Sequence, residues 1–398
     1  MTDKQQQARN AFILAAVSAT AYLGVYFARS ILSAVSPQMT EEGVIGNEGL
    51  GRFSSVFFIV YALGQLINGF LGERIRAKYM IAAGICGAGI CCLLFGRCIG
   101  LPLLATVIYG AMALCLSMVY GPIVKLVAEN MNEVHAVRAS TAYSFSSHFG
   151  ATVAGLAAAA LPWRNVFLLC AAVMLSMGLG CLALFTVFEK KRLIGPSAPR
   201  EKESLAGGVK RLLDREILRF TCVSIITGIV RTSVIFWMPT YFSEHLGFSA
   251  RASAELFTAG TLIISVSSFA AVFLYEKLGR KRDPALLLSF ALSAGFFLLM
   301  LTGGSPFLNA ACMIAAVFCG NMASSVQWSV YCPSLNDTGL VSTATGFLDF
   351  ASYIGAAVSS RLFSTAIESL GWNRLMLIWA GIMALGIGFS FSVKKARS

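Results

Sequence analysis

The sequence predicts an all-α membrane protein with twelve transmembrane helices in two pseudo-symmetric six-helix bundles. Three observations lead to this fold class. Of the 398 residues, 57% are hydrophobic and only 13% are charged, with a mean hydropathy of +0.74, which is more apolar than a soluble domain of this length tolerates. The chain divides into apolar stretches of about 20 residues, the length that spans a bilayer. Short motifs also recur once, in the same order, in its second half.

The apolar stretches account for nearly the whole chain and are joined by short polar connections. The predicted spans are residues 11–36, 51–72, 79–97, 102–127, 139–161, 165–187, 218–242, 253–275, 285–303, 307–332, 340–368 and 373–392. The one long connection, residues 188–217, is charged, contains proline and lacks apolar periodicity. The expected domains are an N-terminal six-helix bundle at 1–187, a cytoplasmic linker at 188–217 and a C-terminal six-helix bundle at 218–398.

The net charge of +12 is distributed regularly along the chain. Basic residues gather in alternate loops, namely Arg74, Arg76 and Lys78; Lys190, Lys191 and Arg192; Lys277, Arg280, Lys281 and Arg282; and Lys394, Lys395 and Arg397. Cytoplasmic loops of membrane proteins show this enrichment. The pattern places both termini in the cytoplasm and the helices in a lipid bilayer, and it makes nucleic-acid binding a poor explanation of the basic charge.

The eleven cysteines are scattered within apolar segments, without metal-ligand spacing. Buried small hydrophobic residues explain them better than redox chemistry does, so we expect no disulfide, metal or other cofactor. The sequence also lacks HExxH and GxSxG motifs and a catalytic paired-carboxylate arrangement. An enzyme is therefore not expected, and no catalytic residue is assigned.

An internal repeat is the most informative feature of the sequence. Arg29 precedes Pro37 by eight residues and Arg231 precedes Pro239 by eight, and the two arginines are 202 positions apart. Two further pairs repeat at nearly the same offset, GFLGERIRAK (69–78) with FLYEKLGRKR (273–282), and LPWRNVFLL with LGWNRLMLI. Three echoes in the same order predict duplicated halves related by a pseudo-two-fold axis along the membrane normal.

Arg29 and Arg231 require an explanation, because an arginine near the middle of a span costs about 2.5 to 3.5 kcal/mol on insertion scales. Their equivalent positions are expected to bring them face to face across a central cavity. Two guanidinium groups suit a tetrahedral oxyanion, since each forms forked hydrogen bonds to its oxygens. The alternative is that each arginine pairs with a buried carboxylate, but Asp349 is the only acid well inside a span.

Several polar residues are candidates for the lining of the same cavity. Helical spacing places Tyr22 and Tyr26 on the face of Arg29, and Tyr61 and Gln65 form a similar i, i+4 pair in the second span. Interfacial anchoring is the alternative for the tyrosines. His148 is the only histidine inside a span and lies in the small, polar segment SFSSHFG; it either faces the cavity or is a hydrogen-bonded packing residue.

The charged loops after the second and eighth spans are candidates for conformational latches. Their residues are Glu73, Arg74 and Arg76 in the first half and Glu276, Lys277 and Arg280 in the second. If the loop charges contact helix ends only when the protein is open to one side of the membrane, they would stabilise that conformation. A merely solvated loop is the alternative, but the recurrence in both halves favours the latch.

The two charged loops and the six-plus-six repeat resemble the major facilitator superfamily over essentially the whole chain. Within it, VRTSVIFWMPTYFSEH resembles the Arg-x-x-x-x-x-Trp-x-Pro-Thr-Tyr signature of the organophosphate:phosphate antiporters, the family of bacterial glycerol-3-phosphate and hexose-phosphate carriers. SSHFG, and TATGFLDFASYIGAAV followed by LGWNR, are similar to that family's fifth and eleventh spans. The resemblance implies a phosphate clamp of Arg29 and Arg231 and a cavity lined by Tyr22, Tyr26, Tyr61, His148 and Tyr353.

Three positions depart from the family pattern. Ser30 and Gln65 stand where lysine is frequent, so two cations are missing from the expected cavity. Gly228 stands where the glycerol-3-phosphate carrier has tyrosine, which points to a larger or less charged solute. Asp349 adds a negative charge near the cavity and is expected to contact hydroxyl or amine groups of the solute.

The expected function is secondary active transport of an organic anion by alternating access. Its preferred form exchanges a phosphorylated solute for inorganic phosphate across a bacterial inner (plasma) membrane, with the protein as a monomer. One alternative is proton-coupled transport of a carboxylate or other organic anion through His148 or Asp349. The other is a membrane sensor that binds a sugar phosphate without net transport.

Overall fold

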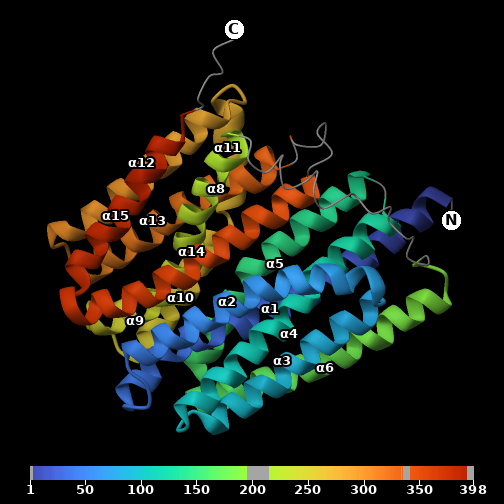
Figure 1. Ribbon diagram of the computed structural model, residues 1–398, viewed down its shortest axis with the longest axis horizontal. Helices are drawn as coiled ribbons and strands as arrows, with labels where there is room; N and C mark the ends of the chain where they lie inside the picture. The colour runs from blue at the N-terminus through green and yellow to red at the C-terminus, as the bar shows by residue number, and fades with distance from the viewer. Residues whose placement is uncertain (1–2, 132, 195–214, 333, 335–340, 392–398) are drawn as a thin grey trace. The chain divides into compact units, whose positions relative to one another are not determined.

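The computed structural model describes residues 3–131, 133–194, 215–332, 334 and 341–391, and every regular element in that part of the chain is a helix (Figure 1). Within these ranges, some side chains are not described: 3–8, 69–70, 72–74, 128, 133–134, 136–138, 140–141, 144, 148, 341–343 and 345. The all-α fold class predicted from the sequence is confirmed.

The helices follow the predicted spans closely. In chain order they are α1 (Asp3–Glu41), α2 (Asn47–Arg74), α3 (Ala77–Cys98), α4 (Pro102–Asn130), α5 (Glu133–Ala160), α6 (Trp163–Lys190), α8 (Arg215–Gly228), η1 (Ile229–Val234), α9 (Ile235–Glu244), α10 (Ala250–Ser265), α11 (Ser267–Lys277), α12 (Arg282–Leu299), η2 (Met300–Thr302), α13 (Pro306–Val326), η3 (Gln327–Tyr331), α14 (Val341–Leu370) and α15 (Trp372–Phe389). Ten passes within the described residues are long and apolar enough to cross a membrane. The 28-residue α5 and the 30-residue α14 complete the predicted twelve.

Four passes consist of more than one element. The seventh runs through α8, η1 and α9, and the tenth through α13 and η3. Both η1 and η3 are π-helical turns, in which the backbone hydrogen bonds span one residue more than in an α-helix. Hydrophobic periodicity does not reveal such turns, and the sequence analysis predicted neither. Arg231 lies within η1.

The chain forms two compact units. One comprises residues 1–44, 60–201 and 250–261, and the other comprises 45–59, 202–249 and 262–398. In the first unit, α1 packs along α5, and α3 packs against α4 and α6. In the second, α8 packs along α14, and α12 packs against α13 and α15. The same three pairings therefore occur in both halves of the sequence, as the repeat predicts.

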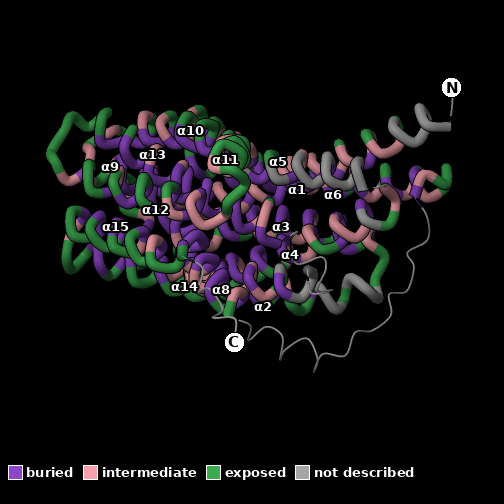
Figure 2. Tube along the Cα trace, turned by 90° about the horizontal axis from the view of Figure 1, so that it is seen from above, coloured by how far each residue is buried: buried purple, intermediate pink, exposed green. Residues whose placement is uncertain are grey.

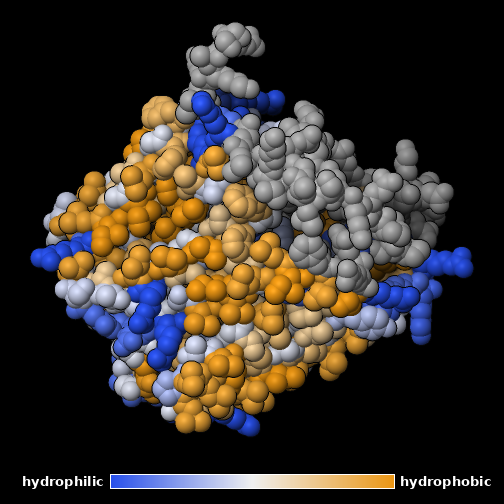
Figure 3. Space-filling view, viewed as in Figure 1, coloured by the Kyte–Doolittle hydropathy of each residue, from blue (hydrophilic) through white to orange (hydrophobic). Residues whose placement is uncertain are grey.

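The surface is apolar where helices face outward. Leu103, Phe307 and Phe12 are 81%, 68% and 74% exposed, and Figure 3 shows apolar side chains over much of the visible face. Burial differs between helices (Figure 2): in the most apolar window, 72% of the α13–η3 pass is buried but only 39% of α15. Exposed apolar surface of this extent suits a lipid environment, and the chain is an integral, multi-pass membrane protein.

Candidate functional site

Arg29 lies among aromatic side chains of the first unit. Its guanidinium carbon is 5.1 Å from the ring centre of Tyr26 on α1 and 5.4 Å from that of Tyr61 on α2. Tyr61 is fully buried and Arg29 is half-buried. Aromatic faces within about 6 Å attract a guanidinium, so the two rings fix this cation inside the helix bundle. The structure thus brings together three residues that the sequence analysis placed in one site.

Tyr22 belongs to a cluster of four tyrosines next to Arg29. Its ring centre is 5.2 Å from that of Tyr26, 5.3 Å from Tyr120 on α4 and 5.9 Å from Tyr143 on α5. Tyr120 and Tyr143 are not among the residues predicted from the sequence. Both lie inside predicted spans, but neither has the helical spacing to an arginine that singles out Tyr22. The cluster carries several phenol groups that can donate hydrogen bonds to an anion.

Two other predicted residues of the first unit are less well defined. Gln65 is half-exposed and lies one helical turn after Tyr61 on α2. His148 lies on α5, but its side chain falls outside the described residues. Gly150, two residues later, meets α1 directly, because a Cβ atom at this position would lie 2.7 Å from the carbonyl oxygen of Leu23 and from the Cβ of Tyr26.

Arg231 has a carboxylate neighbour in the second unit. Its Nη2 is 3.7 Å from Oδ1 of Asp349 on α14, and its guanidinium carbon is 5.9 Å from the ring centre of Tyr353. The side chains of Arg231 and Asp349 are 20% and 26% exposed. The alternative considered for the arginines, pairing with an intramembrane carboxylate, therefore holds for Arg231.

The helices that carry Arg231 and Asp349 are in backbone contact. A Cβ atom at Gly228 would lie 2.5 Å from the carbonyl oxygen of Ser352, and a Cβ atom at Gly355 would lie 2.8 Å from a side-chain carbon of Ile225. The seventh pass thus meets α14 through glycine as α1 meets α5. Leu23 and Ile225 are 202 positions apart, like the two arginines, so this contact repeats between the halves.

Gly228 therefore does not open space beside Arg231. The larger or less charged solute expected from this position stays a prediction. The structure shows that the backbone of Ser352 on α14 occupies the place where a side chain would begin. The glycine is required for the close approach of two helices.

The predicted latch residues differ in what they contact. The side chains of Glu73 and Arg74 lie outside the described residues. Arg76 is 4.0 Å from Glu189 of α6, which also pairs with Lys78. Glu276, Lys277 and Arg280 form no ion pair with any residue that the structure describes, and the ammonium of Lys277 lies 4.7 Å from the ring centre of Phe273.

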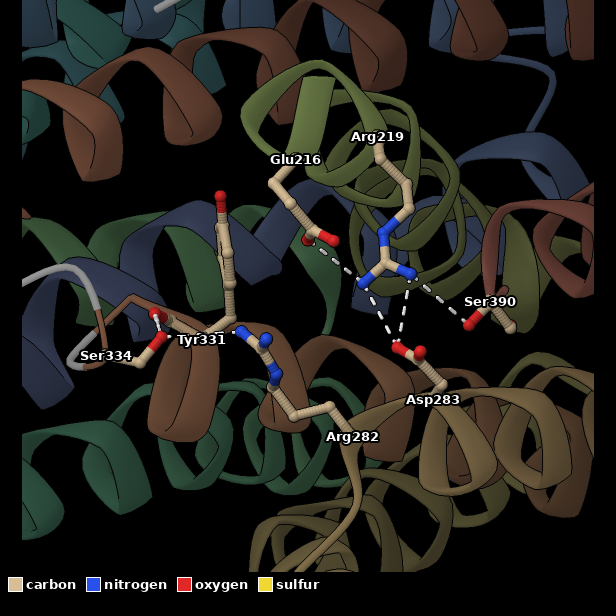
Figure 4. A network of polar contacts seen from close by, with 7 residues as sticks. All are labelled: Glu216, Arg219, Arg282, Asp283, Tyr331, Ser334 and Ser390. Carbon is tan, nitrogen blue, oxygen red and sulfur yellow. Dashed lines mark hydrogen bonds and ion pairs between the residues drawn. The ribbon is translucent and has the colours of Figure 1, made fainter. Parts of the chain in front are cut away.

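Next to the second charged loop, a network of ion pairs forms at the start of α8 (Figure 4). Both terminal nitrogens of Arg219 lie 3.1 Å from Oδ1 of Asp283, and Nη2 is 3.2 Å from Glu216. Nη1 also donates to the carbonyl oxygen of Ser390 at 3.5 Å. Asp283 follows the loop directly at the start of α12. The network ties the ends of α8, α12 and α15 together, and the sequence analysis missed it.

Among the described residues, no group of three His, Cys, Asp or Glu side chains is placed to hold a metal ion. The arrangement offers instead two intramembrane arginines, each beside tyrosine. One of them is paired with an aspartate.

Three relatives span most of this chain at low identity. The Membrane sensor protein UhpC of Salmonella typhimurium is 23% identical, with 97% of this chain and 93% of the relative covered. The Probable sulfoacetate transporter SauU of Cupriavidus necator is 24% identical, with 96% and 93% covered. Sugar phosphate exchanger 3 of Mus musculus is 23% identical, with 81% and 75% covered.

A solved structure shares the fold. A bacterial homologue of the human lysosomal transporter Spinster, in an inward-facing and unoccupied conformation, superposes with a TM-score of 0.77 at 12% identity and covers 96% of both chains. The family model of the Major Facilitator Superfamily matches residues 18–360. The resemblance to the organophosphate:phosphate antiporters is likewise confirmed. With its repeated packing, its intramembrane arginines and this match, the chain belongs to the Major Facilitator Superfamily, a family of transporters and not of enzymes.

Proposed function

We propose that the chain transports an organic anion by alternating access and exchanges a phosphorylated solute for inorganic phosphate. In this proposal Arg29 and Arg231 clamp the anion. The observation that carries it is the environment of Arg29, a half-buried cation held 5.1 and 5.4 Å from two tyrosine rings inside a membrane bundle. Such a cation, fixed in position and partly shielded from water, interacts strongly with an anion.

The remaining predicted residues belong to the same proposal. They are Tyr22, Tyr26, Tyr61, Gln65, His148, Tyr353 and Asp349 as substrate contacts, and Glu73, Arg74, Arg76, Glu276, Lys277 and Arg280 as latches. The name of Sugar phosphate exchanger 3 supports a phosphate ester as one solute. The proposal also includes a monomeric protein in a bacterial inner membrane with both termini in the cytoplasm.

Exchange follows from the net positive charge of the proposed site. Net charge is costly inside the bilayer, so a bound anion lowers the barrier to the step in which the site opens to the other side of the membrane. Without a bound anion, the protein changes slowly between its outward-open and inward-open states. Net transport of the solute therefore requires a second anion to be carried in the opposite direction. This predicts obligate exchange.

Proteoliposomes that contain the purified chain and are loaded with inorganic phosphate test the proposal. We expect uptake of a labelled phosphate ester only when phosphate is inside, and Arg29→Ala or Arg231→Ala should abolish it. Arg251→Ala is the matched control, because Arg251 forms an exposed i, i+4 pair with Glu255, which contributes little to stability. Exchange that survives both clamp substitutions would refute the clamp.

Two relatives favour other functions, and the same vesicles separate them. The name of SauU supports a carboxylate or sulfonate solute, and proton coupling through His148 or Asp349 would then make uptake depend on a pH gradient and not on internal phosphate. The name of UhpC supports a sensor, which would bind the ligand without counterflow in either direction.

A further inference from the structure

The two arginines differ in the residue opposite them on the neighbouring helix. Gly150 and Gly355 occupy equivalent places in the repeated helix contact, 205 positions apart. At the same offset, Asp349 corresponds to Ser144. The carboxylate is therefore present in the second half of the repeat and absent from the first. A purely symmetric anion clamp has no need of it, and the clamp itself leaves it unexplained.

The carboxylate changes which anions Arg231 can accept. With Nη2 of Arg231 and Oδ1 of Asp349 separated by 3.7 Å, an anion that binds the guanidinium comes close to a second negative charge. Both side chains are mostly buried, with 20% and 26% of their surface exposed, so water screens this repulsion only partly. An anion whose surface consists entirely of acceptor oxygens meets the repulsion in full.

The helix contact keeps the carboxylate in place. Gly228 lies one turn before Arg231, and Ser352 lies one turn after Asp349 on α14. Because Gly228 and Ser352 meet at the level of the backbone, the carboxylate cannot leave Arg231 by a small shift of the helix. The incoming solute must accommodate the carboxylate.

A hydrogen-bond donor on the solute removes the conflict. An ionised carboxylate accepts hydrogen bonds at both oxygens, and Oδ1 lies toward Arg231. A solute that presents an O–H or N–H beside its anionic group therefore places the anion on the guanidinium and the donor on the carboxylate.

We propose that Asp349 is a specificity-determining residue that selects anions carrying their own hydrogen-bond donor and rejects anions that lack one. The inference rests on the proposed anion binding at Arg231. Hydrogenphosphate qualifies through its P–OH group, and a phosphate ester qualifies through a hydroxyl or ammonium group on its organic part. Sulfate, which has the same tetrahedral shape and the same double charge but no proton, is rejected.

The test compares matched ligands on purified, detergent-solubilised protein. Inorganic phosphate and sulfate form the first pair. Ethanolamine phosphate and ethyl phosphate form the second, measured at about pH 8 so that the ester group, with a second pKa near 6, is a dianion. Dissociation constants come from calorimetry or from ligand-induced shifts of the unfolding temperature.

The wild type should bind the donor-bearing member of each pair at least about tenfold more tightly, as expected for a hydrogen bond to a charged group. Asp349→Asn should bring this ratio close to one, chiefly through tighter binding of sulfate and ethyl phosphate. Asp349→Glu should keep the preference. Asp283→Asn is the matched control, because it also removes an aspartate paired with arginine in the second unit but should leave the ratio unchanged.

The outcomes separate the two proposals. If the wild type binds anions but shows no preference within the pairs, or if Asp349→Asn keeps the preference, the role of Asp349 is refuted and anion binding stands. If the wild type binds none of the four ligands, the proposed anion site fails and the inference fails with it.

Discussion

Replacing Gly228 with alanine tests whether the contact of the seventh pass with α14 holds Arg231 beside Asp349. The added Cβ atom would lie 2.5 Å from the carbonyl oxygen of Ser352 and 2.8 Å from its Cα, where ordinary contacts begin at 3.4 Å. The obstacle is backbone, so no rotation of a side chain relieves it. The helices must separate by roughly 0.9 Å, and the 3.7 Å distance from Arg231 to Asp349 is expected to increase by a similar amount.

The cost of this crowding can be isolated with a second glycine. Overpacking costs about 1 to 3 kcal/mol, whereas replacing glycine with alanine in a helix gains up to about 1 kcal/mol. Gly381 on α15 belongs to the same unit and has nothing within 4 Å of its would-be Cβ. Gly381→Ala should therefore show only the gain, and the two variants should differ by about 1 to 3 kcal/mol in unfolding free energy.

Thermal unfolding in detergent, followed by tryptophan fluorescence, measures this difference, and the phosphate-to-sulfate binding ratio of Gly228→Ala reports on the position of Asp349. We expect a lower unfolding midpoint than in Gly381→Ala and a reduced ratio. If Gly228→Ala unfolds at the same temperature as Gly381→Ala, the helices are not in backbone contact, and the account of how Asp349 is held is wrong.

Two further predictions concern the ends of the helices. Asp283→Ala leaves the buried guanidinium of Arg219 without its 3.1 Å acceptor, so the unfolding free energy should fall by about 1 to 3 kcal/mol; a midpoint equal to that of the wild type would show that Glu216 suffices alone. Burial lowers the pKa of His245, which follows α9 and lies beside Tyr241, with the two ring centres 5.2 Å apart. Unfolding restores the ordinary pKa of about 6.5, so the unfolded chain binds more protons and stability should fall as the pH decreases below about 6.5. His245→Gln should weaken this dependence between about pH 7.5 and 5.5, and an identical pH profile would contradict it.

Most of the fold could be predicted from the sequence, because the length of each apolar span and the internal repeat can both be recognised in the sequence alone. Apolar stretches of about 20 residues can only be helices in a bilayer, and the ends of most predicted spans lie within a few residues of the observed helices. The largest difference is at α1, which begins at Asp3 and not at residue 11. Polar residues continue this helix beyond the apolar stretch, and a search for spans does not detect them.

The sequence could not predict contacts that join distant residues. The partner of Arg219 is 64 positions away at Asp283, and no periodicity links the two. The π-helical turn around Arg231 is a local change in hydrogen bonding that leaves composition unaltered. The packing role of Gly228 could not be predicted for the same reason, because only the three-dimensional structure places Ser352 beside it.

Ser30, Gln65 and Asp349 all make the proposed site less positive than the family pattern implies. Ser30 and Gln65 remove two positive charges where the family often has lysine, and Asp349 adds a negative one. In the proposed site, the charges of Arg29, Arg231 and Asp349 then sum to a single positive charge. A bare dianion would leave such a site with a net negative charge inside the membrane, at considerable cost. An ammonium group on the solute offsets part of that charge, and an O–H or N–H donor stabilises the Asp349 carboxylate by a hydrogen bond; solutes with such groups are the class that Asp349 is positioned to recognise.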